Sequence, residues 1–164
     1  MYLKRFRLIG LAIVLLLGSG CASVKFDTGD DEILKISPTQ ALNESHNSGA
    51  VIWGGQIVSV HNLQHTTELV ILSYPLSNGH VPKIDKDSGK RFLAVYTGFL
   101  EPLSYAPGRY VSLYGDLQSP VGLMTGEYET PAPAVQVKQI HLWDANTSQW
   151  QNRVNFGVGI GVSL

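Results

Sequence analysis

Three groups of side chains have residue types and spacings that could support chemistry. The first is a thiol, Cys21, the only cysteine in the 164 residues. The second is a histidine pair, His61 and His65, whose four-residue spacing on a helix would place two imidazoles on one face for zinc. The third is a carboxylate pair, Asp85 and Asp87, of the kind used in acid and base catalysis. Whether each group has a functional or a structural role depends on the helix, strand or loop that is expected to carry it.

The surroundings of the histidine and carboxylate pairs predict solvated loops. His61 and His65 bracket a short turn at a strand end, and no cysteine or third ligand stands at an interval typical of a metal site. Asp85 and Asp87 lie among three lysines, so their charges are neutralised within the loop. The mature chain also lacks a nucleophile elbow, a phosphate-cradling loop and a dinucleotide fingerprint. We therefore predict no catalytic residue, no metal site and no cofactor.

The first 20 residues have the three parts of an export signal. A basic head at residues 4–7 precedes an uninterrupted apolar run from Leu8 to Leu17, and three small residues follow at 18–20. The run is too short for a finished membrane-spanning helix, which takes roughly 20 apolar residues. We predict that residues 1–20 are a signal peptide that is cleaved, which makes Cys21 the first residue of the mature chain.

Cys21 directly follows this signal, where it has no second cysteine for an intramolecular disulfide. Its position resembles a bacterial lipobox, although Gly18 stands three residues before it, where that motif prefers Leu, Val or Ile. The resemblance implies an S-diacylglycerol thioether on Cys21 and N-acylation of the new N-terminus. Each buried methylene of the acyl chains contributes about 0.8 kcal/mol, so the predicted partner of the chain is a membrane, held permanently through covalent lipid.

Length and charge limit the remaining possibilities. A chain of this length has room for one domain, since domains usually run to roughly 100–150 residues. Removal of the signal takes away three of the 12 basic side chains and none of the 13 acidic ones, which leaves a net charge of −4 with neutral histidines. A mildly acidic domain is a poor partner for nucleic acid, which calls for clustered Lys and Arg. We predict no nucleic-acid partner.

The segment 21–45 is expected to hold the lipidated cysteine, a tether and a short helix. Residues 22–36 are polar and acidic without a sustained apolar period, which predicts a tether that contributes no apolar burial. Ser37 is a candidate N-cap with Pro38 at the first helical position. A short helix to about Ser45 is therefore expected.

Residues 46–145 carry short apolar runs separated by turn residues, which predict β-strands. The expected strands are Val51–Val60, Thr67–Tyr74, Arg91–Phe99, Tyr110–Leu117 and Ala134–Trp143. Two glycines at 54–55 predict a bend or bulge, and residues 77–90 predict a long solvated connection. The predicted fold is mainly β, a small five-stranded antiparallel OB-like barrel with one short N-terminal helix. A sandwich would need about seven strands, and a generic small barrel or open sheet is the alternative.

The last segment, residues 146–164, is a C-terminal tail with a strand-like alternation. From Val154 to Leu164 every second residue is apolar, and the residues between them are Asn, Gly or Ser. Six apolar residues in register predict an extra strand on the barrel or a contact with the membrane or a partner. The alternative is a frayed terminus.

The chain contains a series of short motifs whose order and spacing are informative: 54–58 (GGQIV), 67–71 (TELVI), 74–76 (YPL), 89–94 (GKRFLA), 98–105 (GFLEPLSY), 108–111 (GRYV) and 141–143 (HLW). Together they resemble the Slp family of starvation-inducible outer-membrane lipoproteins, except that Glu101 stands where the family has Asp. The resemblance implies a lipid-anchored outer-membrane protein of a Gram-negative bacterium, with its domain facing the periplasm, no assigned catalytic activity and a link to starvation or stress.

The same motifs have a structural interpretation, and a second function stays open beside the first. Arg109 is placed to pair with Glu101 or Asp116 across the turn at Gly108. The second function is an OB-like binding module for a glycan or peptide, using one barrel face and two loops. Five aromatic residues are candidates for that face, with core packing as the alternative: Tyr74, Tyr96, Tyr110, Tyr114 and Trp143. Either function is compatible with an envelope protein as partner, whose identity is open.

Overall fold

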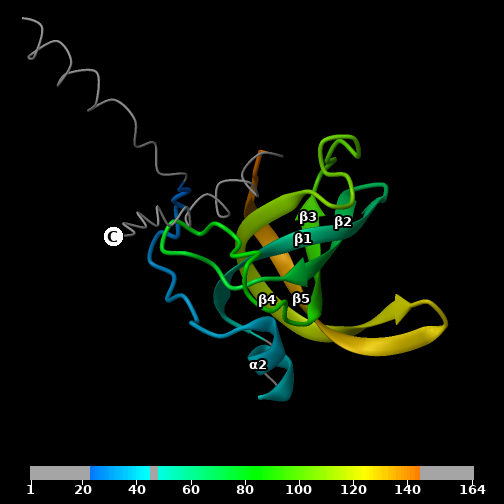
Figure 1. Ribbon diagram of the computed structural model, residues 1–164, viewed down its shortest axis with the longest axis horizontal. Coiled ribbons are helices and arrows are strands. Elements are labelled where there is room, and N and C mark those ends of the chain that lie inside the picture. The colour runs from blue at the N-terminus through cyan, green and yellow to red at the C-terminus, as the bar shows by residue number, and fades with distance from the viewer. Residues whose placement is uncertain (1–22, 45–47, 145–164) are drawn as a thin grey trace, which may run out of the picture.

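The computed structural model describes residues 23–44 and 48–144, in which five strands close into a barrel beside one short helix (Figure 1). The elements are α2 (Pro38–Asn43), β1 (Ala50–Asn62), β2 (Thr66–Ser73), β3 (Arg91–Thr97), β4 (Tyr110–Thr125) and β5 (Tyr128–Leu142). Around the barrel the strands follow the order β1-β2-β3-β5-β4. This arrangement confirms the predicted mainly β, OB-like fold with a short N-terminal helix.

One strand pair runs parallel in an otherwise antiparallel barrel. β1 pairs antiparallel with β2 and β4, as do β2 with β3 and β4 with β5. β3 and β5 pair in parallel, with Leu93 opposite Ala134 and Tyr96 opposite Val137. A closed ring with an odd number of strands cannot alternate in direction throughout, so one parallel pair is a geometric necessity of five-stranded closure.

The barrel interior is filled by alternate residues of each strand. In β2, Thr67, Leu69, Ile71 and Ser73 are buried while the residues between them are partly exposed, which is the period of two that a strand imposes. Trp53 and Phe92 meet edge to face inside the barrel, with ring centroids 5.3 Å apart. Each fully buried large apolar side chain contributes about 1.5–3 kcal/mol, so this packed core is the main source of stability.

The helix α2 begins as its sequence predicts and ends earlier than expected. The Ser37 side chain accepts a hydrogen bond from the Gln40 amide at 3.2 Å, and the Gln40 side chain accepts one from the Ser37 amide at 2.9 Å. This reciprocal capping box, with Pro38 in the first turn, satisfies donors that a helix N-terminus leaves free. The helix ends at Asn43 rather than near Ser45, and Ala41 is fully buried against the barrel core.

The glycine pair at 54–55 allows close packing instead of forming the predicted bulge. The register shift in β1 lies further along, between Ile57 and Ser59. A Cβ added at Gly55 would lie 2.8 Å from the carbonyl carbon of Leu72 and 2.9 Å from the Cα of Ser73, and closer still to the Leu72 oxygen. The backbone of β2 therefore occupies the space that any side chain at Gly55 would need.

The strands β4 and β5 are much longer than the sequence predicts. Expected to end at Leu117 and to begin at Ala134, they continue as a two-stranded ribbon, residues 118–133, that leaves the barrel and pairs only with itself up to Thr125 and Tyr128. In Figure 1 this ribbon projects from the barrel on the side opposite residues 23–30. Pro131 lies in this ribbon and is exposed, and a proline is compatible with a strand where its missing N–H faces solvent.

Candidate functional site

The segment that leads to Cys21 lies along the barrel. We call residues 23–36 the N-terminal strap. At its C-terminal end Leu34 donates its amide to the carbonyl of Ala50 at 2.8 Å, and the Trp53 indole donates to the carbonyl of Ile36 at 2.7 Å. Leu34 and Ile36 pack against the core. The prediction that this segment contributes no apolar burial is wrong, because two apolar side chains suffice to fasten it without any sustained period.

The other end of the strap is held by the segment that follows β2. The amide of Val24 donates to the carbonyl of Gly79 at 3.0 Å, and the His80 ring nitrogen Nδ1 donates to the carbonyl of Val24 at 2.9 Å. The ring of Phe26 packs against that of His80, with centroids 5.6 Å apart. The strap is therefore fixed to the domain from Val24 onward, the fourth residue counted from Cys21.

Charged groups hold the middle of the strap. The Asp31 carboxylate accepts hydrogen bonds from the Tyr114 hydroxyl and from Lys138 Nζ, the latter at 2.8 Å, and Lys138 also contacts Asp116 at 2.8 Å. The hydrogen bond from Lys138 lowers the pKa of Asp31, and the hydrogen bond to Asp31 raises the pKa of Tyr114. A carboxylate whose pKa is lowered keeps its contact at neutral pH and loses it only as the pH falls through that pKa.

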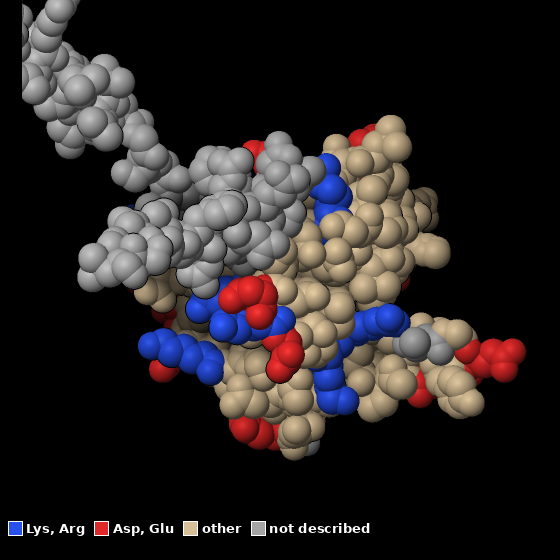
Figure 2. All heavy atoms as spheres, in the orientation of Figure 1, with Lys and Arg blue, Asp and Glu red and all other residues tan. Residues whose placement is uncertain are grey.

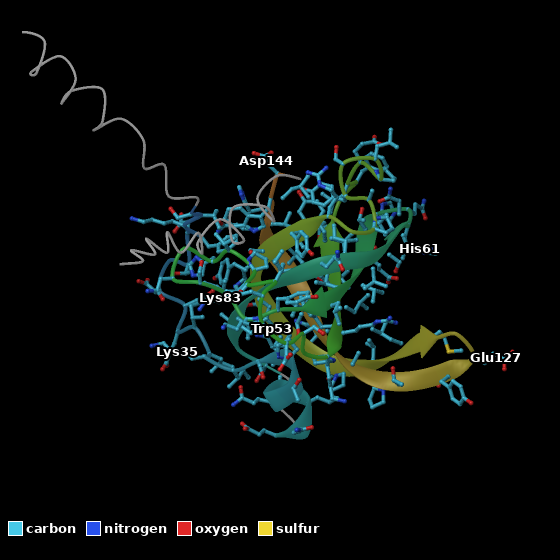
Figure 3. All side chains as sticks on the ribbon, in the orientation of Figure 1. Lys35, Trp53, His61, Lys83, Glu127 and Asp144 are labelled. Atoms are coloured by element: carbon cyan, nitrogen blue, oxygen red, sulfur yellow. The ribbon has the colours of Figure 1, made fainter. Side chains whose placement is uncertain are left out.

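A pocket of about 760 Å³ opens between the strap, the beginning of β1 and the segment after β2. Its walls are mainly apolar and half-buried, and they include Ile33, Ile36, Ile52, Tyr74 and Leu76. A few polar residues, among them Asn78, His80 and Asp87, stand in the same wall. Figure 3 shows Trp53, which also lines the pocket, at the barrel end beside α2. The volume is in the range of small-ligand sites, about 300–1,000 Å³.

The histidine and carboxylate pairs lie in the loops where the sequence places them. His61 is the penultimate residue of β1 and is exposed (Figure 3). His65 is exposed in the turn that follows. Asp85 is exposed and lies 3.5 Å from Lys86, whereas Asp87 reaches the wall of the pocket. Within residues 23–44 and 48–144, no group of three or more His, Cys, Asp or Glu side chains is placed to hold a metal ion.

The five aromatic candidates do not share one binding face. Tyr114 is buried beneath the strap, and Trp143 is buried with its indole N–H donating to the Ser112 hydroxyl at 2.9 Å. Tyr74 and Tyr110 contact each other edge to face, with centroids 6.3 Å apart, and Tyr96 packs against the core. These aromatic side chains serve packing in separate places, and only Tyr74 lines the pocket.

Arg109 does not form either of its expected ion pairs in the described structure. Its guanidinium donates to the backbone carbonyl of Trp143 at 3.1 Å, which ties the turn before β4 to the end of β5. Asp116 contacts Lys138 instead, and the Glu101 carboxylate accepts from the amide of Leu103 at 3.4 Å. The sequence shows the charged residues near Arg109, but it does not show that the carbonyl of Trp143 lies within hydrogen-bond distance of the guanidinium.

Several predicted features fall outside the described residues. Cys21, the predicted lipidation site, and the alternating tail at 146–164 are among them. In the part of the chain that the structure describes, no helix is long and apolar enough to cross a membrane. Sequence reasoning missed the strap and the pocket. Their signal was a set of scattered apolar residues in a polar segment: Val24, Phe26, Ile33, Leu34 and Ile36.

Comparison with known proteins identifies similarities at two levels. The model of the outer membrane lipoprotein Slp family matches residues 19–158. Among curated proteins, no sequence matches this chain.

Solved structures with a similar chain course include the Stn1–Ten1 complex of S. pombe, with 13% identity over 65% of this chain and 73% of that chain and a TM-score of 0.37. The mitochondrial single-stranded DNA-binding protein Rim1 of S. cerevisiae has 13% identity over 58% and 95%, at a TM-score of 0.36. The small single-stranded DNA-binding protein of Streptomyces coelicolor has 12% identity over 62% and 98%, at a TM-score of 0.34.

Proposed function

Because the chain belongs to the outer membrane lipoprotein Slp family, we propose that its barrel is a non-catalytic component of the cell envelope that faces the periplasm. Membership makes it a lipid-anchored outer-membrane protein of a Gram-negative bacterium. We infer that the anchor is an S-diacylglycerol, N-acylated Cys21. The family resemblance further supports a link to starvation or stress.

The position of Cys21 relative to the family match and to the strap carries this proposal. The family match begins two residues before Cys21, and Val24, whose amide donates to the carbonyl of Gly79, lies three residues after it. The thiol therefore sits at the junction between an apolar export signal and a folded domain. Lipid on this residue places the whole barrel on the same side of the membrane as the chain that follows it.

The periplasmic orientation is tested by thiol labelling in cells. Because a lipidated Cys21 has no free thiol, a cysteine introduced by Glu127→Cys at the exposed tip of the β4–β5 ribbon is the one reactive site. We expect a membrane-impermeant maleimide to label it only after the outer membrane is permeabilised.

The control is Leu69→Cys, whose side chain is fully buried in the barrel and reacts only in unfolded protein. Labelling of Glu127→Cys in intact cells, with Leu69→Cys unlabelled, would place the barrel on the cell surface and contradict the proposal.

A second candidate function, a binding module, is favoured by the pocket. Its half-buried apolar wall suits a peptide with apolar side chains better than a glycan, since glycans call for more polar partners and an exposed aromatic face. Of the five aromatic candidates only Tyr74 stands there. We therefore propose an apolar peptide segment of an envelope protein as the ligand of this second function.

Photocrosslinking in cells tests the binding module. A photoreactive amino acid at Leu76, in the pocket, is expected to give a discrete crosslinked product that disappears when Ile52 is replaced by Glu. Met124 is the control position, because it is exposed on the distant ribbon. Identical products from Leu76 and Met124, or products that persist in Ile52→Glu, would rule out the pocket as the binding site.

A further inference from the structure

The distance between the lipid anchor and the folded barrel is short. Two residues, Ala22 and Ser23, separate Cys21 from Val24, whose amide and carbonyl are both bonded to the barrel. A fully extended chain advances at most about 3.3–3.6 Å per residue, so Val24 lies within about 11 Å of the lipidated residue. This bound follows from the covalent chain alone.

The strap converts this short connection into a fixed orientation. Were residues 23–36 a free tether, they would let the barrel move as far as about 45 Å from the anchor and turn in any direction. Backbone bonds at Val24 and Leu34, the charged contacts of Asp31 and the indole bond to Ile36 hold the strap at both ends and in its middle. The barrel surface next to Val24 is therefore the surface next to the membrane.

We propose that the surface formed by Val24, Lys25, Asn78, Gly79 and His80 rests on the phospholipid headgroups of the membrane that holds the anchor. This inference rests on lipidation of Cys21, the proposed anchor. We call these five residues the membrane-apposed surface. The β4–β5 ribbon, on the opposite side of the barrel in Figure 1, is then directed away from the membrane.

The membrane is the occupant of this surface because of the covalent connection and not because of charge. Lys25 brings a positive charge, but the strap also exposes Asp27, Asp30 and Asp31, and the mature chain is net acidic. Such a surface has little electrostatic attraction for anionic lipid. Figure 2 shows basic and acidic side chains intermixed on the barrel and acidic ones at the ribbon tip, where Glu127 and Glu129 lie.

The orientation is tested with the full lipidated protein, purified and reconstituted into vesicles of phosphatidylethanolamine and phosphatidylglycerol. Asn78→Cys, on the membrane-apposed surface, and Glu127→Cys, at the ribbon tip, are labelled with a fluorophore, and lipids carrying a nitroxide on the headgroup serve as quenchers. Both positions are exposed, so both accept the label. We expect quenching to be severalfold stronger at residue 78 than at residue 127. Equal quenching at the two positions overturns the proposal.

A flexible Gly/Ser segment of 12 residues, inserted between Ala22 and Ser23, provides the second measurement. The insertion leaves the strap and barrel intact but releases the distance limit, so the difference between the two positions is expected to vanish. A difference that persists shows that the surface binds lipid by itself and overturns the role of the short connection. Failure of the anchor is seen separately, because an unlipidated protein does not float with the vesicles and keeps a reactive thiol at Cys21.

Discussion

A chain with Gly55 replaced by alanine is expected to lose at least about 3 kcal/mol of its free energy of unfolding, at the upper end of what overpacking costs. The added methyl group would fall on the backbone of Leu72 and Ser73, which cannot move without separating β1 from β2. Small domains have only about 5–15 kcal/mol of stability in total. Thermal unfolding followed by circular dichroism should show a midpoint lowered by more than about 10 °C.

Gly122→Ala is the matched control for this prediction. A Cβ at Gly122 would meet atoms at similarly short distances, but these belong to the side chain of Glu129, which can turn away into solvent. Gly122 also lies in the ribbon outside the barrel. We expect its melting midpoint to stay close to that of the unsubstituted protein. If Gly55→Ala and Gly122→Ala melt alike, the backbone contact at Gly55 is not what requires glycine there.

Cys21→Ser is expected to remove the protein from the membrane altogether. Serine cannot form the thioether that carries the diacylglycerol, and the N-terminal acyl chain depends on the same processing. Since one acyl chain alone binds membranes only marginally, loss of all the chains leaves no anchor. Fractionation after metabolic labelling with palmitate should show label in the unsubstituted protein and none in Cys21→Ser.

A double variant, Cys21→Ser with Ser23→Cys, separates the position of the thiol from its presence. The thiol is then two residues further from the apolar run, and we expect neither label nor membrane association to return. Recovery of either would show that a cysteine near the strap is sufficient and that Cys21 has no special place. Palmitate label in Cys21→Ser itself would mean that the lipid is attached elsewhere.

The barrel could be predicted from the sequence because its strands are bounded by strong local signals. The alternation in β2 and β3 and the turn at Pro107 and Gly108 place strands that the structure confirms to within two residues. The capping pattern at Ser37 is equally local. Burial of a strand face repeats along the chain, so a single sequence shows it.

The strap was missed because its contacts are not periodic, and the ribbon because it contains residues typical of loops. Asp31 meets Tyr114 and Lys138, which lie 83 and 107 residues away, so nothing near Asp31 in the sequence distinguishes it from a solvated acid. In the ribbon, Pro120 and Pro131 are typical of loops, but Pro120 lies within a register shift of the ladder and Pro131 is exposed opposite Gly122. A proline is compatible with a strand at such positions. The pocket depends on the strap and was missed with it.

The prolines of the ribbon also bear on how neighbouring copies meet. Lipoproteins held in one plane and one orientation would carry their ribbons at equal height, where unpaired strand edges invite sheet formation between molecules. Pro131 is exposed in β5 and has no N–H to offer an incoming strand, which weakens pairing at this part of the ribbon. A crowded two-dimensional layer of these proteins can thus keep its ribbons separate, and each one stays available to a partner other than itself.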